Sequence, residues 1–220
     1  VECGEEVAMA KKVDLKKGEL GRHVSNAAKA IADGYIIAIP MENSYAFACD
    51  AFRADTVRAM HVLRGDSIFT AAQVIVGSAK TTNGIIREIT PEIKALMRKF
   101  WPGMLSLNLR PYEGLSWDLG DANQLDRVSV RVPRATFAKA LTAHTGPLAI
   151  ASAARKGLQP PLTLDEVLVM DTDLAIKFNN GKLRKSAQST IVEADESGVR
   201  LLREGAISRA EIKKIVPNLG

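Results

Sequence analysis

The amino-acid sequence predicts an α/β protein, and three observations support this prediction. Segments with the apolar period of helices alternate along the chain with short runs that are apolar throughout or alternate as strands do. The length of 220 residues is usual for one domain. A hydrophobic content of 46% is enough for a core, which 5% aromatic residues make mainly aliphatic. Without a repeat or linker, we expect one domain at residues 19–220, after an N-terminal extension at residues 1–18 that mixes charges and frays.

The expected helices are marked by apolar faces and by capping residues. The first covers residues 19–33, with Val24, Ala27 and Ile31 on one face and Gly34 after its end. Further helices are expected at residues 53–63, 90–101, 135–143 and 208–216, with a short one near residues 163–168. The signals for their starts are Thr90 before Pro91, and the capping-box pairs Thr163 with Glu166 and Ser208 with Glu211.

The expected strands are short and lie between these helices. Residues 41–50, "MENSYAFACD", are expected to form a loop that leads into another apolar segment. The run "MLSLNLR" alternates with period two, which predicts a half-buried strand, and "RVSVRVP" alternates in the same way. The remaining strands read "YIIAIP", "AAQVIVGS", the apolar start of "PLAIASAARKG", and the two halves of "QSTIVEADESGVRLLREG" around a turn at Ser197-Gly198.

Charge and cysteine content narrow the function classes. The net charge of +5 permits binding to phosphates or RNA but does not require it. Cys3 and Cys49 have no neighbours at metal-ligand spacing, so we expect neither a disulfide scaffold nor a zinc site, and a reducing, cytoplasmic compartment fits. The start "VECGEEVAMAKK" has no signal-peptide core, and no run of about 18 apolar residues predicts a membrane span.

Cations stand at the ends of several predicted elements. Arg64 precedes Gly65, Arg131 lies on an alternating strand, Arg203 ends the last strand, and Arg155 follows the apolar run of "PLAIASAARKG". Ligands of open α/β sheets tend to bind at such ends, so together these residues favour an anionic ligand. Taken singly, each is better explained as an ordinary basic surface residue. The sequence contains no recognisable triad of nucleophile, base and acid.

Motifs along nearly the whole chain carry a family resemblance. Seven segments carry it, in this order from about residue 20 to 215: "GYIIAIPMENSYAFACDA", "LRGDSIF", "FWPGMLSLNL", "VSVRVPRATFAKAL", "GPLAIASAARKG", "PLTLDEVL" and "QSTIVEADESGVRLLREGAIS". In order and spacing the chain resembles the Sua5/YciO/YrdC family, in its single-domain YrdC form. The resemblance implies a YrdC-like twisted mixed sheet, flanked by helices around a basic concave cavity.

The resemblance also implies a function. Family members are L-threonylcarbamoyladenylate synthases, nucleotidyltransferases that use threonine, bicarbonate and ATP with Mg²⁺ and release pyrophosphate. Their product feeds a modification of tRNA, and the domain has also been described as binding double-stranded RNA. No covalent nucleophile is required, so we assign no catalytic residue and no metal ligand. Catalysis of this type rests on positioning and charge neutralisation.

Two groups of site residues follow from the motifs that match. Nucleotide and phosphate binding is assigned to Arg64, Ser152, Ser189 and Arg203. The small-substrate pocket is assigned to Glu42, Tyr45 and Arg131.

The site motifs are degenerate at several positions. Where the family has lysine-glycine-arginine, this chain has Arg64, Gly65 and Asp66, so we expect a carboxylate that repels a triphosphate. Ala154 replaces an asparagine whose amide would bond a ligand or neighbour. Met41 and Asn43 replace threonines.

Three functions therefore stay open. The first is a protein that binds ATP or an RNA phosphate in a basic cavity, with an active synthase site or a silent one. The second is a non-catalytic module that binds double-stranded RNA or tRNA, and the third is a related carbamoyl chemistry on another small substrate. The sequence predicts no membrane association and does not indicate the oligomeric state.

Overall fold

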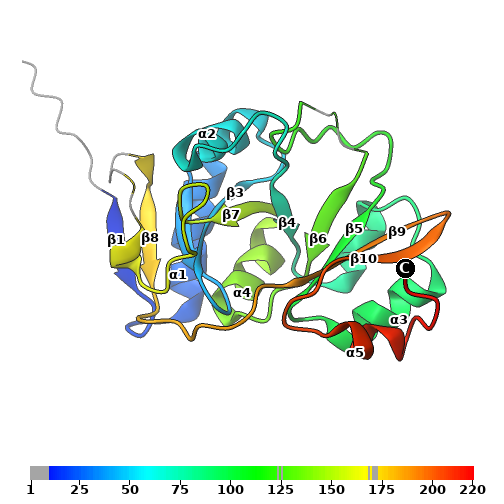
Figure 1. Cartoon of the computed structure of the whole chain (residues 1–220). Helices are drawn as coiled ribbons and strands as arrows, with labels where there is room; N and C mark the ends of the chain where they lie inside the picture. The colour runs from blue at the N-terminus through cyan, green and yellow to red at the C-terminus, as the bar shows by residue number, and fades with distance from the viewer. Residues whose placement is uncertain (1–9, 123, 125, 168, 170–172) are drawn as a thin grey trace, which may run out of the picture.

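The computed structural model describes residues 10–122, 124, 126–167, 169 and 173–220. Within this part a single mixed sheet runs from β1 at one edge to β10 at the other (Figure 1). Its strand order is β1-β8-β2-β3-β7-β4-β6-β5-β9-β10, with both parallel and antiparallel pairs. The predicted class, an α/β protein with a twisted mixed sheet flanked by helices, is confirmed.

The strands are short, as the sequence predicts. Their bounds are β1 Lys11–Asp14, β2 Ile37–Pro40, β3 Tyr45–Asp50, β4 Gln73–Ile75, β5 Leu105–Leu109, β6 Val128–Arg131, β7 Leu148–Ser152, β8 Ile176–Asn179, β9 Thr190–Asp195 and β10 Gly198–Arg203. The helices are α1 Leu20–Ala32, α2 Ala54–Arg64, α3 Pro91–Phe100, α4 Thr136–Thr145 and α5 Arg209–Lys213, with 3₁₀ turns η1 Ala79–Gly84 and η2 Leu164–Glu166. None of the described helices is long and apolar enough to cross a bilayer.

The helices cover both faces of the sheet because successive strand residues point to opposite sides. In β2, Ala38 belongs to an apolar cluster that includes side chains of α2 and α3, whereas Ile37 and Ile39 belong to a second cluster with α1 and α4. This double cover explains a difference from expectation. The strand β5 was expected to be half-buried, but Leu105, Ser106, Leu107 and Leu109 are all buried.

Two of the predicted helix starts are confirmed. The Thr90 side chain accepts a hydrogen bond from the Ile93 amide, and Ser208 with Glu211 forms a complete capping box at α5. The prediction of a capping box between Thr163 and Glu166 was wrong. Thr163 makes no side-chain cap bond, and Glu166 instead accepts from the Leu162 amide at 2.7 Å. Here the chain makes one 3₁₀ turn rather than an α-helix.

The segment expected to be a loop, residues 41–50, contains strand β3, which pairs with β2 and β7 inside the sheet. The strands β1 and β8 were not predicted either. Each has four residues, with the sequences "KKVD" and "IKFN", and their ladder pairs Lys11 with Ile176 across the length of the chain. A strand held by such a distant partner leaves no local pattern to recognise. The expected frayed extension covers residues 1–18. Its residues 1–9 lie outside the described residues, but residues 11–14 form an edge strand of the sheet, so the expectation is wrong for this part.

Candidate functional site

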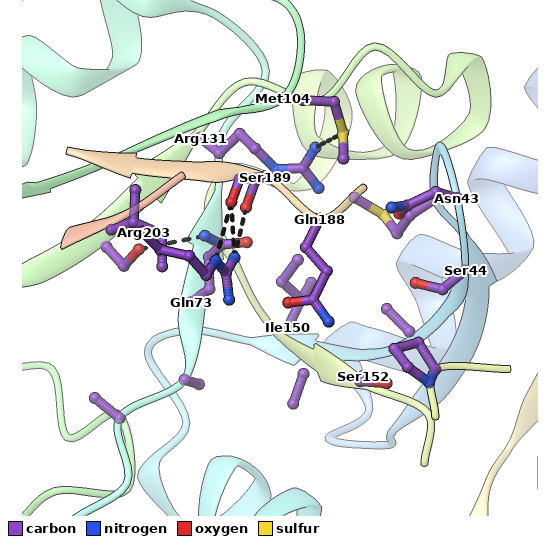
Figure 2. A pocket seen from close by; sticks show the side chains of 18 of the residues that line it. Asn43, Ser44, Gln73, Met104, Arg131, Ile150, Ser152, Gln188, Ser189 and Arg203 are labelled. Carbon is purple, nitrogen blue, oxygen red and sulfur yellow. Dashed lines mark hydrogen bonds between the residues drawn. The ribbon is translucent and has the colours of Figure 1, made fainter. Parts of the chain in front are cut away.

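A cavity of about 820 Å³ opens beside β3, β4, β6, β7 and β9. Its size lies in the range of about 300–1,000 Å³ that is usual for small-molecule sites. Side chains from distant parts of the chain face it: Figure 2 shows Arg203, Ser189 and Gln73 on one side, and Asn43, Ser44 and Ser152 on another. The cavity therefore lies where several strands end. Of the four cations that the sequence places at element ends, Arg131 and Arg203 line it, whereas Arg64 and Arg155 do not.

The structure brings four of the predicted site residues into this lining: Arg131, Ser152, Ser189 and Arg203. Glu42 lies directly behind the lining and contacts Arg131. Arg64 and Tyr45 do not line the cavity.

Arg203 is the cation best placed to meet a ligand. Its Nε and Nη2 donate to the Ser189 carbonyl at 3.1 and 2.8 Å, and Nη2 also donates to Ser189 Oγ at 3.2 Å. Among the described residues no carboxylate pairs with Arg203, and its Nη1 has no hydrogen-bond partner. Partial burial lowers the pKa of Arg203 from its ordinary value. The guanidinium is thus oriented by Ser189 while its charge stays uncompensated, which suits an anionic ligand.

A chain of hydroxyl and amide groups fixes Ser189. Gln73 Nε2 donates to Ser106 Oγ at 2.6 Å, and Ser106 Oγ donates to Ser189 Oγ at 2.9 Å. Ser189 Oγ therefore accepts from both Ser106 and Arg203, so its own proton remains to be donated to a ligand oxygen. Gln73 is a site residue that sequence reasoning missed, since an isolated glutamine at a strand start gives no signal.

Ser152 carries a second unused hydroxyl. Its Oγ is buried and has no hydrogen-bond partner among the described residues, although the residue lines the cavity at the end of β7. Buried hydroxyls are almost always bonded to protein or to water. The Ser152 hydroxyl therefore has a hydrogen bond to give to a molecule in the cavity.

The cation Arg131 is already neutralised. Its Nη1 donates to Glu42 Oε2 at 2.9 Å, and Glu42 Oε1 accepts from the Arg134 amide at 2.6 Å. The side chains of Arg131 and Glu42 are only 5% and 14% exposed, so this is a buried ion pair. The Arg131 Nε is buried in the same place and has no hydrogen-bond partner in the part of the chain that the structure describes. Arg131 can bond a ligand there, while Glu42 cancels most of its charge.

Arg64 and Asp66 form a separate buried cluster. Arg64 Nε donates to Asp66 Oδ2 at 2.7 Å, and Arg64 Nη2 donates to Asp66 Oδ1 at 3.2 Å. His61 Nδ1 lies 2.8 Å from Asp66 Oδ2, and its Nε2 lies 2.9 Å from the Leu119 carbonyl oxygen. The Asp66 side chain is 4% exposed, so the expectation that it faces a bound triphosphate is wrong. The carboxylate points at its two cationic or polar neighbours instead.

The same cluster holds the turn that follows β7. Arg64 Nη1 donates to the carbonyls of Ser152 and Ala154, the latter at 2.9 Å, and the Lys156 amide donates to the Arg64 carbonyl at 2.8 Å. Arg64, predicted to bind phosphate, therefore uses its guanidinium to position the backbone behind Ser152. The asparagine that Ala154 replaces in the family would stand on this turn.

Tyr45, predicted in the small-substrate pocket, is fully buried. Its hydroxyl donates to the Gly181 carbonyl at 2.7 Å and accepts from the Asn180 amide at 2.9 Å. Burial raises the pKa of Tyr45, which the hydrogen bond from Asn180 partly offsets. Tyr45 thus anchors the chain where it leaves β8, just before the segment that borders the cavity.

We expect Tyr45→Phe to lower the free energy of unfolding by about 1–3 kcal/mol, because the Gly181 carbonyl and the Asn180 amide each lose a buried partner. Urea denaturation followed by circular dichroism measures this. Tyr35→Phe, at a residue that is 56% exposed, is the matched control and should change little. Equal stabilities of the wild type and Tyr45→Phe would contradict the anchoring role.

Asn43 holds the border of the cavity in place. Its Nδ2 donates to the carbonyls of Ala187 at 2.9 Å and Ser186 at 3.3 Å. These bonds tie the loop before β3 to the segment that carries Lys185 and Gln188, both of which line the cavity. The asparagine that replaces a family threonine therefore has a structural partner, which the sequence alone could not reveal.

The charge balance of the cavity depends on few groups. Arg127 lines it but pairs with Glu193 at 3.4 Å and Asp195 at 3.0 Å. Lys185 lines it and has no ion pair within the described residues. No three histidine, cysteine or carboxylate side chains gather as a metal-binding group in this part of the chain. Arg203 and Lys185 thus provide positive charge without an ion pair among the described residues, while Glu166 adds one lining carboxylate that likewise has none there.

Comparison with known proteins gives consistent matches. The family model Sua5_yciO_yrdC, described as "Telomere recombination", matches residues 29–205. A protein of Mycobacterium tuberculosis named "Putative threonylcarbamoyl-AMP synthase" is 32% identical over 196 residues, which cover 89% of each chain. The "Threonylcarbamoyl-AMP synthase" of Pyrococcus abyssi is 27% identical over 192 residues, 86% of this chain and 56% of that protein.

Solved structures show the same fold. A variant of Pyrococcus abyssi Sua5 superposes with a TM-score of 0.87 at 25% identity; the match covers 96% of this chain and 61% of that one. The Sua5 of the same organism in complex with L-threonine gives 0.85 at 24% identity, over 97% and 63%. Escherichia coli YciO gives 0.76 at 16% identity, over 90% and 96%. The chain therefore spans under two thirds of the Sua5 protein.

Proposed function

Because the chain belongs to the Sua5/YciO/YrdC family, we propose that its cavity binds ATP and condenses it with threonine and bicarbonate into L-threonylcarbamoyladenylate. The proposal rests on one observation: Arg203, Ser189 and Ser152 line the same cavity. There Arg203 can contribute its charge, and the two serine hydroxyls can each donate a hydrogen bond to a ligand. The names of relatives that span most of this chain support the choice of reaction.

The two ends of the cavity would bind different substrates, ATP at one end and threonine at the other. Phosphate oxygens suit Arg203 and the Ser189 proton, because charge-assisted hydrogen bonds are the stronger kind. Arg131 and Glu42 form a nearly neutral pair, which suits a zwitterionic amino acid better than a phosphate. We expect Mg²⁺ to arrive on the nucleotide phosphates, since this ion commonly uses one or two carboxylates together with substrate oxygens.

The proposed reaction needs no enzyme nucleophile. The threonine amine and bicarbonate combine to a carbamate with loss of water. One carbamate oxygen then attacks the α-phosphorus of ATP, and the bond to the β-phosphate oxygen breaks, which releases pyrophosphate. The chain contributes by placing the carbamate in line with that bond and by balancing the charge that moves to the leaving group at Arg203.

Two other functions compete with this one. A double-stranded RNA-binding module would depend on the net charge of +5 rather than on the cavity. A related chemistry on another small substrate would depend on Met41 and Asn43, where the family has threonines. Both residues line the cavity, and the Asn43 Nδ2 is engaged with backbone carbonyls, so they would change the shape of the pocket at this wall.

The test is release of pyrophosphate from ATP and Mg²⁺, with each substrate omitted in turn. We expect release that requires both threonine and bicarbonate. Release that instead requires a different amino acid from a panel of twenty would support the changed small substrate. No release at millimolar substrates, together with RNA binding that weakens steeply with salt, would replace the synthase with the RNA-binding module.

A further inference from the structure

A second cavity lies apart from the candidate site. It has a volume of about 670 Å³ and shares no lining residue with the first cavity. Its walls come from η1, α3, α4 and the segments that join them to the sheet. We call it the basic groove, because its rim carries Lys80, Lys94, Arg98 and Lys139.

The four cations of the basic groove have no counter-charge. All are exposed, and none forms an ion pair within the described residues. The described lining contains no aspartate or glutamate. Lys94 and Arg98 stand one turn apart on α3, where like charges repel and weaken the helix. A groove that gathers cations without a carboxylate keeps a positive potential that attracts an anionic partner.

The floor of the basic groove is apolar. Ile89 is half-buried, and Met97 and Trp101 reach the floor with exposed fractions of 5% and 9%. An apolar floor inside a polar rim is the usual anatomy of a protein-binding site. A nucleic acid backbone would satisfy the rim but would leave this floor without a partner.

We propose that the basic groove binds an acidic peptide segment of a partner protein, with one large apolar side chain of that segment on the floor. Carboxylates on either side of the apolar residue would meet Lys94 and Arg98 on one wall, and Lys80 and Lys139 on the others. Charge complementarity of this kind selects the partner and raises the rate of encounter. The inference is independent of the reaction in the first cavity.

Fluorescence anisotropy with labelled probe peptides tests this binding. The first probe set has a central tryptophan, phenylalanine or leucine flanked by glutamates and aspartates. The second replaces the apolar residue with glycine, and the third probe is a short RNA duplex. We expect saturable binding of the first set and at least about tenfold weaker binding of the second. Added salt should weaken the binding of the first set.

Charge-reversal variants test whether the peptide binds at the basic groove. Lys94→Glu with Arg98→Glu, and separately Lys80→Glu with Lys139→Glu, should each weaken the first probe set by about tenfold or more. These residues are exposed, so melting curves should stay close to the wild type. The matched control is Arg22→Glu with Lys29→Glu, two exposed cations of α1 that form no ion pair with any described residue, and it should leave binding unchanged.

Three results would overturn the proposal. They are no saturable binding up to about 1 mM peptide, equal binding of the glycine probes, and equal weakening by the Arg22 and Lys29 control. Binding of the RNA duplex in place of the peptides, lost in the groove variants, would assign the groove to nucleic acid instead.

Discussion

Replacing Arg203 with alanine is expected to weaken ATP binding about a hundredfold, equivalent to about 3 kcal/mol. The change removes the cavity cation that Ser189 orients and that no described carboxylate neutralises. It also removes one of the two hydrogen bonds that Ser189 Oγ accepts. Only the bond from Ser106 Oγ then orients the Ser189 hydroxyl. Isothermal titration of ATP with Mg²⁺ measures the loss.

Two further variants sharpen that experiment. Arg203→Lys keeps the charge but loses the planar fork of donors, so its affinity should lie between those of the wild type and the alanine variant. Arg22→Ala removes an exposed cation of α1 that no described carboxylate pairs with, and it should leave the affinity unchanged. If Arg203→Ala binds ATP as tightly as Arg22→Ala does, the nucleotide does not use the cavity as described.

Replacing Asp66 with asparagine is expected to lower the free energy of unfolding by about 3 kcal/mol. The variant leaves the Arg64 guanidinium, whose side chain is 15% exposed, without its buried counter-charge. It also removes the carboxylate that faces His61 Nδ1. Urea denaturation at neutral pH measures the difference. Asp165→Asn is the control: its carboxylate is 88% exposed, and its ion pair with Lys12 should contribute at most about 1 kcal/mol.

The contribution of Asp66 should depend on pH in a defined direction. Burial by itself raises the pKa of Asp66, but the hydrogen bonds and charges of Arg64 and His61 outweigh burial and lower it. A lowered pKa in the folded state gives stability that is complete above the unfolded value of about 3.9. That stability is lost as pH falls through the folded-state pKa. The difference between the wild type and Asp66→Asn should shrink over this acidic range; a constant difference would contradict the ion pair.

The cluster also changes how the degenerate motif is understood. Asp66→Arg, which restores the arginine of the family, would place a second cation beside Arg64 and remove the carboxylate that neutralises it. We expect this variant to be destabilised rather than improved in nucleotide binding. Restoring the motif would require Arg64 to leave the Ser152 and Ala154 carbonyls as well.

The regular elements were predictable where their patterns are local. The apolar faces of α1 and α3, and the caps Thr90 and Ser208, follow from residue type and spacing alone. The strands β1 and β8 were not predictable, because four partly charged residues become a strand only through a partner far along the chain.

The candidate site was predictable only in part. Family motifs mark Ser152, Ser189 and Arg203, and the structure brings these residues to one cavity. The partners of Asp66 and Asn43 depend on where side chains turn after the chain has folded. The residue type of Asp66 indicated its charge but suggested a bound triphosphate as its neighbour. The buried carboxylate instead pairs with the cation beside it, Arg64. Gln73 acts through Ser106, which stands on a different strand.

The most direct measurement of the central claim is mass spectrometry of the reaction products. The protein is incubated with ATP, Mg²⁺, threonine and ¹³C-labelled bicarbonate, alongside Arg203→Ala and Arg22→Ala. We expect an adenylate that contains threonine and carries the carbon label, formed by the wild type and Arg22→Ala and greatly reduced in Arg203→Ala. Absence of any labelled adenylate, or its formation at the same rate by Arg203→Ala, would contradict the proposed role of the cavity.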